Sequence, residues 1–177
     1  MSDRIECLGG ETHFEGSQFQ VRVERFRYDD GEIVERELVR RQGAAAIVAY
    51  DDEHVWLVRQ PREVLGRYTL ELPAGKLDVE GESALQTAQR ELAEEIGREA
   101  ERWEEILVFN PSVGYTDELV HVFAATDLRD SDVDPIAGER IEVVPWPLSD
   151  LDGAIAATSD AKTLLGLAWL RRELESR

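Results

Sequence analysis

Residues 71–97 read ELPAGKLDVEGESALQTAQRELAEEIG, and the pattern of this stretch decides the fold. Its first residues are predicted to end a β-strand, because Pro73 and Gly75 interrupt the strand pattern. Ser83 is a residue type that begins helices and Gly97 is a type that ends them, so a helix is predicted between the two. The stretch is therefore expected to form a strand, a loop and an acidic helix.

The predicted helix has one apolar face. At about 100° per residue, four apolar residues fall within a narrow wedge that is expected to pack on the core: Leu85, Ala88, Leu92 and Ile96. Glu91 and Glu95 lie about 40° apart at the border of this wedge, and Glu94 lies further round on the same side. Two or three carboxylates are therefore predicted to project towards one point beside the sheet.

Carboxylates this close must be compensated, since like charges repel by about 1 kcal/mol per pair even in water. Arg90, four residues before Glu94, cancels one of the charges. A divalent cation would cancel the rest, and hard oxygen ligands select Mg²⁺ or Mn²⁺. The three histidines are scattered and the chain has one cysteine, which argues against zinc.

Acidic helical faces are usually just solvated, and the alternative is that these glutamates serve only tolerance to salt. The chain has a net charge of −18, and 18 of its 20 basic residues are arginine. Such an acidic, lysine-poor surface fits a halophilic organism, in which concentrated salt screens self-repulsion. Four glutamates at set positions would nevertheless arise by chance only about once in 3,000 registers. The pattern therefore favours a metal site.

Composition excludes several classes of protein. No basic stripe is present to neutralise phosphates, so nucleic acid is not an expected partner. No run approaches about 18 apolar residues, so no membrane span is expected, and the N-terminus lacks an apolar signal segment. The single cysteine, Cys7, fits a reducing cytoplasm and is expected to be a buried apolar residue. A length of 177 residues suits one domain with a small appendage.

The rest of the chain alternates strand patterns with a few helices. Residues 17–28 and 32–40 predict an N-terminal β-hairpin around the turn at Gly31. Further strands are predicted at 43–50, 54–60, 67–72, 103–109, 118–126 and 141–144. Ser149 is expected to begin a short helix, and Ser159 or Asp160 the last helix. Many strands with interspersed helices indicate an α+β fold with a mixed sheet.

The acidic stretch resembles the Nudix box, Gly-x5-Glu-x7-Arg-Glu-apolar-x-Glu-Glu-x-Gly-apolar. Seven residues match at the expected spacing: Glu82, Arg90, Glu91, Leu92, Glu94, Glu95 and Gly97. Two departures are visible, because six residues rather than five separate Gly75 from Glu82, and Arg98 stands where the family prefers an apolar residue. Neither departure removes a carboxylate.

The similarity extends over roughly residues 17–155. GRYTLELPAGKLD at 66–78, Gln60-Pro61-Arg62, and PSVGYTDE at 111–118 resemble the ADP-ribose pyrophosphatase branch of the Nudix hydrolases, with Val113 where that branch commonly has proline. The resemblance implies a mixed β-sheet sandwiched between helices at 43–177. It also implies a homodimer in which the hairpin region, 1–42, contributes to dimerisation and to substrate binding.

The resemblance assigns roles to individual residues. Glu91, Glu95 and the carbonyl of Ala74 are the implied metal ligands, with Arg90 orienting the carboxylates and Glu94 supporting them. Glu139 matches the family's general base, with Glu82 and Glu94 as competitors.

Arg62 and Glu71 are at positions that contact substrate in this branch, although Arg62 would otherwise form an ion pair with Glu63 or Glu71. An adenine would stack on an aromatic ring, with these candidates: Phe14, Phe19, Phe26 and Tyr28.

These roles imply Mg²⁺-dependent hydrolysis of ADP-ribose, or a similar nucleoside diphosphate sugar, to a nucleoside monophosphate and a sugar phosphate. One alternative keeps the chemistry and changes the substrate to another sugar nucleotide, NADH or a damaged nucleotide, and Val113 is the residue that leaves it open. The other alternative is a Nudix module that binds a nucleotide without cleaving it. Such modules usually lose glutamates of the box, whereas this chain keeps them all.

Overall fold

The structure is a computed structural model that describes residues 4–133 and 140–176. Its strands are β1 (Glu6–Glu15), β2 (Gln20–Arg27), β3 (Ile33–Arg40), β4 (Ala44–Tyr50), β5 (His54–Arg62), β6 (Arg67–Glu71), β7 (Ala74–Lys76), β8 (Arg98–Phe109), β9 (Val120–Asp130) and β10 (Glu142–Pro147). Its helices are α1 (Ala84–Ile96), α2 (Leu151–Ala157) and α3 (Ala161–Glu175), with short 3₁₀ turns at Glu63–Leu65 and Leu148–Asp150. No helix in the described ranges is long and apolar enough to cross a membrane.

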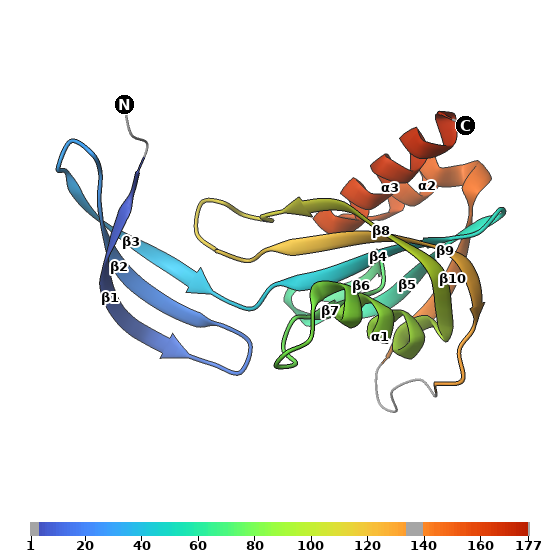
Figure 1. Ribbon diagram of the computed structural model, residues 1–177, viewed down its shortest axis with the longest axis horizontal. Coiled ribbons are helices and arrows are strands. Elements are labelled where there is room, and N and C mark those ends of the chain that lie inside the picture. The colour runs from blue at the N-terminus through green and yellow to red at the C-terminus, as the bar shows by residue number, and fades with distance from the viewer. Residues whose placement is uncertain (1–3, 134–139, 177) are drawn as a thin grey trace. The chain divides into compact units, whose positions relative to one another are not determined.

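The chain forms two compact units (Figure 1). Unit 1 comprises the chain up to Gly43 together with Asn110–Leu119, and unit 2 comprises Ala44–Phe109 together with the chain from Val120 onward. Within unit 1, the amide of Val39 donates a hydrogen bond to the carbonyl of Tyr115, which ties the later segment to β3. The roles expected for residues 1–42, in dimerisation and in substrate binding, stay predictions.

Unit 1 is a three-stranded antiparallel sheet in the order β1-β2-β3, not the expected hairpin. The additional strand, β1, escapes periodicity because register shifts between Cys7 and Gly10 and between Thr12 and Phe14 break its alternation. Gly10 is required at the first shift, since a Cβ there would lie 2.0 Å from the carbonyl oxygen of Val23. Cys7 is exposed on this strand, so the expectation of a buried cysteine was wrong.

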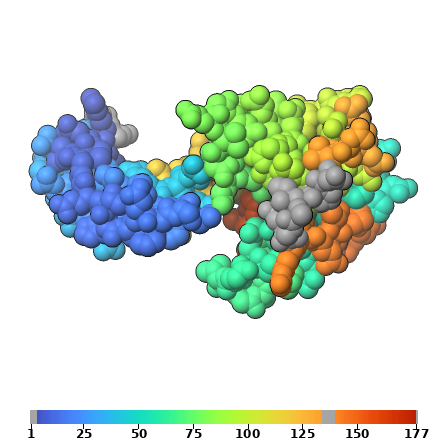
Figure 2. Space-filling model, turned by 90° about the horizontal axis from the view of Figure 1, so that it is seen from below, coloured from blue at the N-terminus to red at the C-terminus, as the bar shows by residue number. Residues whose placement is uncertain are grey.

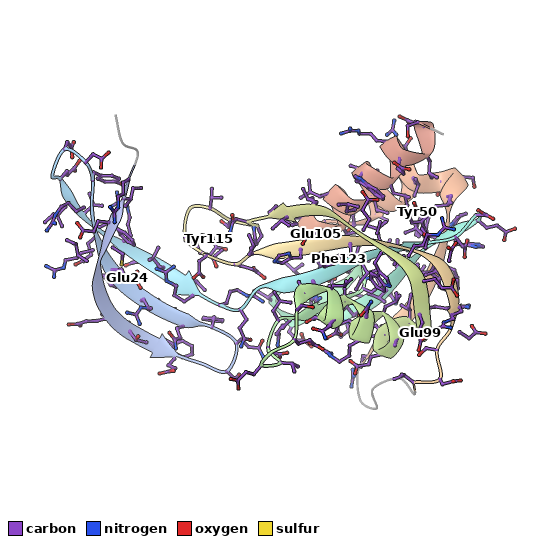
Figure 3. The ribbon with its side chains drawn as sticks, in the orientation of Figure 1. Glu24, Tyr50, Glu99, Glu105, Tyr115 and Phe123 are labelled. Carbon is purple, nitrogen blue, oxygen red and sulfur yellow. The ribbon has the colours of Figure 1, made fainter. Side chains whose placement is uncertain are left out.

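Unit 2 is a seven-stranded mixed sheet between helices. The main path is β10-β5-β4-β9-β8, with β6 on β5 and β7 on β4, and β4 and β9 are its parallel pair. Side chains of β4 alternate between two cores: Ala45 and Ile47 join α1, whereas Ala46 and Val48 join α2 and α3. The expected α+β fold, with a mixed sheet sandwiched between helices, is confirmed. Figure 3 labels one aromatic residue from each core, Tyr50 and Phe123.

The residues that cap α1 are those predicted from the sequence, whereas the residue that caps α2 differs from the prediction. Ser83 accepts a hydrogen bond from the amide of Gln86, whose side chain accepts one from the amide of Ser83, and Gly97 ends α1 with φ of 65°. Asp150 rather than Ser149 caps α2, and Asp160 caps α3. In both cases an aspartate accepts a hydrogen bond from an amide of the first turn.

Candidate active site

Glu91 and Glu95 of α1 lie against the backbone of β7. The amide of Ala74 donates a hydrogen bond to Glu95 Oε2 at 3.0 Å. A Cβ added to Gly75 would lie 1.9 Å from Glu91 Oε1, so only glycine leaves room for that carboxylate. The structure therefore brings together the three predicted metal ligands, because the two carboxylates of α1 lie against neighbouring residues of β7, Ala74 and Gly75.

Arg90 lies among three carboxylates of the same stretch, one of which is Glu91. Its Nη1 donates to Glu91 Oε1 at 2.7 Å and to Glu94 Oε2 at 2.9 Å, while Nε and Nη2 donate to the two oxygens of Glu82 at 3.2 Å each. The hydrogen bonds that Arg90 donates to Glu82, Glu91 and Glu94 outweigh burial and raise the pKa of Arg90. This one guanidinium therefore orients three glutamates.

Glu82 also has a second partner, the hydroxyl of Thr87, which donates to its Oε2 at 2.8 Å. Hydrogen bonds from Arg90 and Thr87 lower the pKa of Glu82, because both stabilise the ionised form. Thr87 is fully buried on α1 and was not singled out from the sequence. The only sign of Thr87 in the sequence is that a polar residue directly precedes Ala88, which belongs to the apolar face.

The chemistry of these residues fits a hard divalent cation. Among the described residues, no three His, Cys, Asp or Glu side chains form a metal-binding group by themselves. Mg²⁺, however, is usually bound by only one or two carboxylates together with waters and substrate phosphates. Glu91 and Glu95 supply two carboxylates beside β7. Four glutamates and one arginine also leave this cluster with a formal charge of −3, which favours a cation.

Arg62, which is partly exposed, and Glu71, which is buried, form a bidentate ion pair. Arg62 Nε donates to Glu71 Oε1 at 2.6 Å and Nη2 donates to Oε2 at 2.7 Å. Burial raises the pKa of Glu71, but hydrogen bonds and charge from Arg62, Lys162 and Thr69 outweigh it and lower the pKa to about 2. The sequence alternative of a pair with Glu71 is thus what the structure shows, and a contact of Arg62 with substrate stays a prediction.

Of the remaining sequence candidates, one lies outside the described residues and the others belong to unit 1. Glu139 lies outside the described residues. Phe14, Phe19, Phe26 and Tyr28 all belong to unit 1, and none of them is buried. Phe14 and Phe19 are exposed, with ring centroids 5.7 Å apart.

One face of unit 2 is hollowed (Figure 2). Green atoms of the β7–α1 region and teal atoms of the β5–β6 region stand on either side of the hollow, and red atoms of α3 are visible between them. The carboxylates of α1 and the Arg62–Glu71 pair belong to the two flanking regions.

A mixed sheet between helices, with a glutamate-rich helix folded onto a glycine-containing strand, defines the class of protein. The family model described as NUDIX domain matches residues 39–165, and the chain belongs to this family. The resemblance seen in the sequence is therefore confirmed. Enzymes of the family generally use divalent metal ions.

The chain is also similar to individual proteins. The chain is 44% identical over 127 residues to the ADP-ribose pyrophosphatase of Mycobacterium tuberculosis (strain H37Rv), a match that covers 71% of this chain and 61% of that protein. It is 36% identical over 175 residues to the ADP-ribose pyrophosphatase of Bacillus subtilis (strain 168), covering 94% and 92% of the two chains. A crystal structure of an ADP compounds hydrolase matches with a TM-score of 0.85 at 24% identity, over 98% of this chain and 95% of that one, which supports the fold.

Proposed function

We propose that this protein is a Mg²⁺-dependent Nudix pyrophosphohydrolase. Its substrate is ADP-ribose or a similar nucleoside diphosphate sugar, which it cleaves to AMP, or another nucleoside monophosphate, and a sugar phosphate. The single observation that carries the proposal is the placement of Glu91 and Glu95 against the backbone of β7. The Bacillus subtilis relative, named ADP-ribose pyrophosphatase and matched over 92% of its length, supports the substrate class.

The acidic and the basic residues of the site have different proposed roles. Glu91, Glu95 and the carbonyl of Ala74 would hold the metal, which when bound supplies neutralisation of the pyrophosphate and activation of water. Arg90 keeps the carboxylates oriented by its hydrogen bonds to Glu82, Glu91 and Glu94. Arg62 binds a phosphate of the substrate, because its guanidinium is held in place by Glu71 and is still 41% exposed.

Proton removal from the attacking water is assigned to Glu139. The competing residues are both bound by Arg90, and a carboxylate that accepts hydrogen bonds from arginine is a weaker base. The lowered pKa of Glu82, caused first by Arg90 and then by Thr87, supports this choice. Replacing Glu139 with glutamine is therefore expected to lower kcat by about 100-fold or more, as for loss of a general base.

The assembly proposed is a homodimer in the cytoplasm. Unit 1 supports the dimer because its small sheet leaves apolar side chains exposed, among them Ile5, Phe14 and Ile33. The single, exposed Cys7 supports a reducing compartment. Light scattering of the purified protein should give twice the chain mass of 20.0 kDa. A mass of one chain at micromolar concentration would overturn the dimer.

The decisive experiment is a substrate panel with Mg²⁺, in which products are identified by chromatography. ADP-ribose is expected to give AMP and ribose 5-phosphate, and faster turnover of GDP-mannose or NADH would overturn the substrate. Val113, in place of the branch's usual proline and strongly exposed, is the reason to include these alternatives. Wild-type protein that binds ADP-ribose but never cleaves it would instead identify a nucleotide-binding module.

A matched pair of variants tests the metal site. Glu95→Gln should abolish hydrolysis while its melting temperature stays within a few degrees of wild type, because only the charge is removed. Glu104→Gln removes the same charge from an exposed position of β8 and should keep full activity. Activity that survives in Glu95→Gln would show that the assignment of Glu95 is wrong.

A further inference from the structure

The first turn of α3 is bonded to the end of β6. Lys162 Nζ lies 2.6 Å from Glu71 Oε2, and the amide of Leu72 donates a hydrogen bond to Thr163 Oγ1 at 2.8 Å. Gly166, one turn further along α3, lets the helix approach closely, since a Cβ there would lie 2.6 Å from the Leu72 side chain. These contacts hold the helix against the two residues that precede the turn into β7.

The carboxylate of Glu71 binds two cations, Arg62 and Lys162. Glu71 is 3% exposed and receives both Arg62 and Lys162, so the three side chains together carry a formal charge of +1. Lys162 also lies 2.9 Å from Asp160, but Asp160 caps α3, where the amides of the first turn stabilise its negative charge. Counting Asp160, two cations face two carboxylates, and Glu71 is the carboxylate that both cations bind.

Arg62 is the cation of this group that solvent and substrate can reach. Its side chain is 41% exposed, whereas that of Lys162 is 14% exposed, so Arg62 is the more accessible cation of the two. Glu71 engages Nε and Nη2 of Arg62, which leaves Nη1 outside the pair. The pKa of Arg62 is raised first by Glu71 and in smaller part by Asp160 and Glu95, so its guanidinium lies within electrostatic range of a predicted metal ligand.

We propose that Lys162 is a positioning residue of the active site. By binding the buried carboxylate of Glu71, Lys162 shares the charge that would otherwise be matched by Arg62 alone. Arg62 is thereby held in a fixed orientation and keeps positive charge for a phosphate of the substrate. The inference rests on the proposed function, because it requires that a phosphate-bearing substrate binds at Arg62.

The test replaces Lys162 by methionine, which keeps most of the length and removes the charge. The KM for ADP-ribose is expected to rise roughly tenfold with kcat changed less than about threefold, as for loss of binding that is uniform between ground and transition states. Lys162→Arg should restore KM to within about threefold, since it returns the charge. Arg171→Met removes a positive charge from an exposed position of the same helix and should leave KM unchanged.

Affinity for ADP-ribose without divalent metal, measured by calorimetry, gives a second readout that does not depend on turnover. A purely structural role predicts a lower melting temperature and less active protein with an unchanged KM and affinity. That result in Lys162→Met, or equal values in Lys162→Met and Arg171→Met, overturns the inference and leaves the proposed function intact. Wild-type protein that binds but does not cleave overturns the proposed function, and the calorimetric comparison then still decides on Lys162. Wild-type protein that neither binds nor cleaves ADP-ribose overturns both.

Discussion

Gly75→Ala is the sharpest test of the site geometry, because it adds one methyl group where Glu91 now lies. The new Cβ would be 1.9 Å from Glu91 Oε1, 2.1 Å from Cδ and 2.3 Å from Cγ. Real Cβ contacts begin near 3.0 Å, so the carboxylate must retreat by roughly 1 Å. A misplacement of about 1 Å in a catalytic group costs about 100-fold in rate, or about 2.7 kcal/mol.

Steady-state kinetics and a Mg²⁺ titration measure this effect. The substitution should lower kcat/KM about 100-fold and raise the Mg²⁺ concentration for half-maximal activity, since Glu91 is displaced from β7. Overpacking should cost about 1–3 kcal/mol, a fall of a few degrees in melting temperature for a chain of this size. Wild-type kinetics and Mg²⁺ dependence in Gly75→Ala would refute the placement of Glu91.

A double-mutant cycle separates the clash from general damage. Glu91→Asp withdraws the carboxylate from the added methyl, so the second substitution should cost less in Gly75→Ala than in wild type. Groups in direct contact show such coupling, whereas independent effects add to within about 0.5 kcal/mol. Additive losses in kcat/KM would show that Gly75 acts other than through Glu91.

Three further predictions concern charge and metal. Glu71→Gln should cost about 3–5 kcal/mol at pH 7, because two cations lose their buried partner. Glu71 has a folded pKa of about 2 against an ordinary 4.5, so its contribution is present above pH 4.5 and is lost as pH falls towards 2. The difference in unfolding free energy between wild type and Glu71→Gln should therefore shrink over that range, and a constant difference in urea titrations would contradict the shift. Raising NaCl from about 0.1 M to about 2 M should raise the melting temperature, because a net charge of −18 is screened, and a lower value would remove the case for salt adaptation. EDTA should abolish hydrolysis and excess Mg²⁺ should restore it, and activity that persists in EDTA would exclude a metal-dependent reaction.

Local features of the sequence were enough to predict the helix of the site. The 3.6-residue period placed Ala88, Leu92 and Ile96 on the buried face, and all three are buried in the structure. The ends of the helix followed from Ser83 and Gly97, whose preferences act over a single turn. The contact of Arg90 with Glu94 follows from the same geometry, since residues four apart lie on one side of a helix. The hydrogen bond of Arg90 to its immediate neighbour Glu91 does not follow from that rule.

Long-range contacts left no such signal. Lys162 and Glu71 are 91 residues apart, and no periodicity relates a lysine on the last helix to a glutamate at the end of β6. The approach of Gly75 to Glu91 depends on the pairing of β7 with β4, and a three-residue strand is too short to show an alternation. Register shifts hid β1 for a different reason, because each extra residue reverses the side-chain pattern that periodicity detects.

In an acidic enzyme, the net negative charge opposes the binding of an anionic substrate. A net charge of −18 repels a pyrophosphate at long range, so attraction must be supplied within a few ångströms. Unit 2 offers two local sources: the partly exposed guanidinium of Arg62, whose buried partner Glu71 is shared with Lys162, and the carboxylates of α1 that would hold a divalent cation. Losing Lys162 should therefore weaken substrate binding more at low ionic strength than at high, because salt screens the repulsion that its charge offsets. Measuring the KM of Lys162→Met relative to wild type across NaCl concentrations tests this, and a ratio that does not change with salt would show that Lys162 acts by geometry rather than by charge.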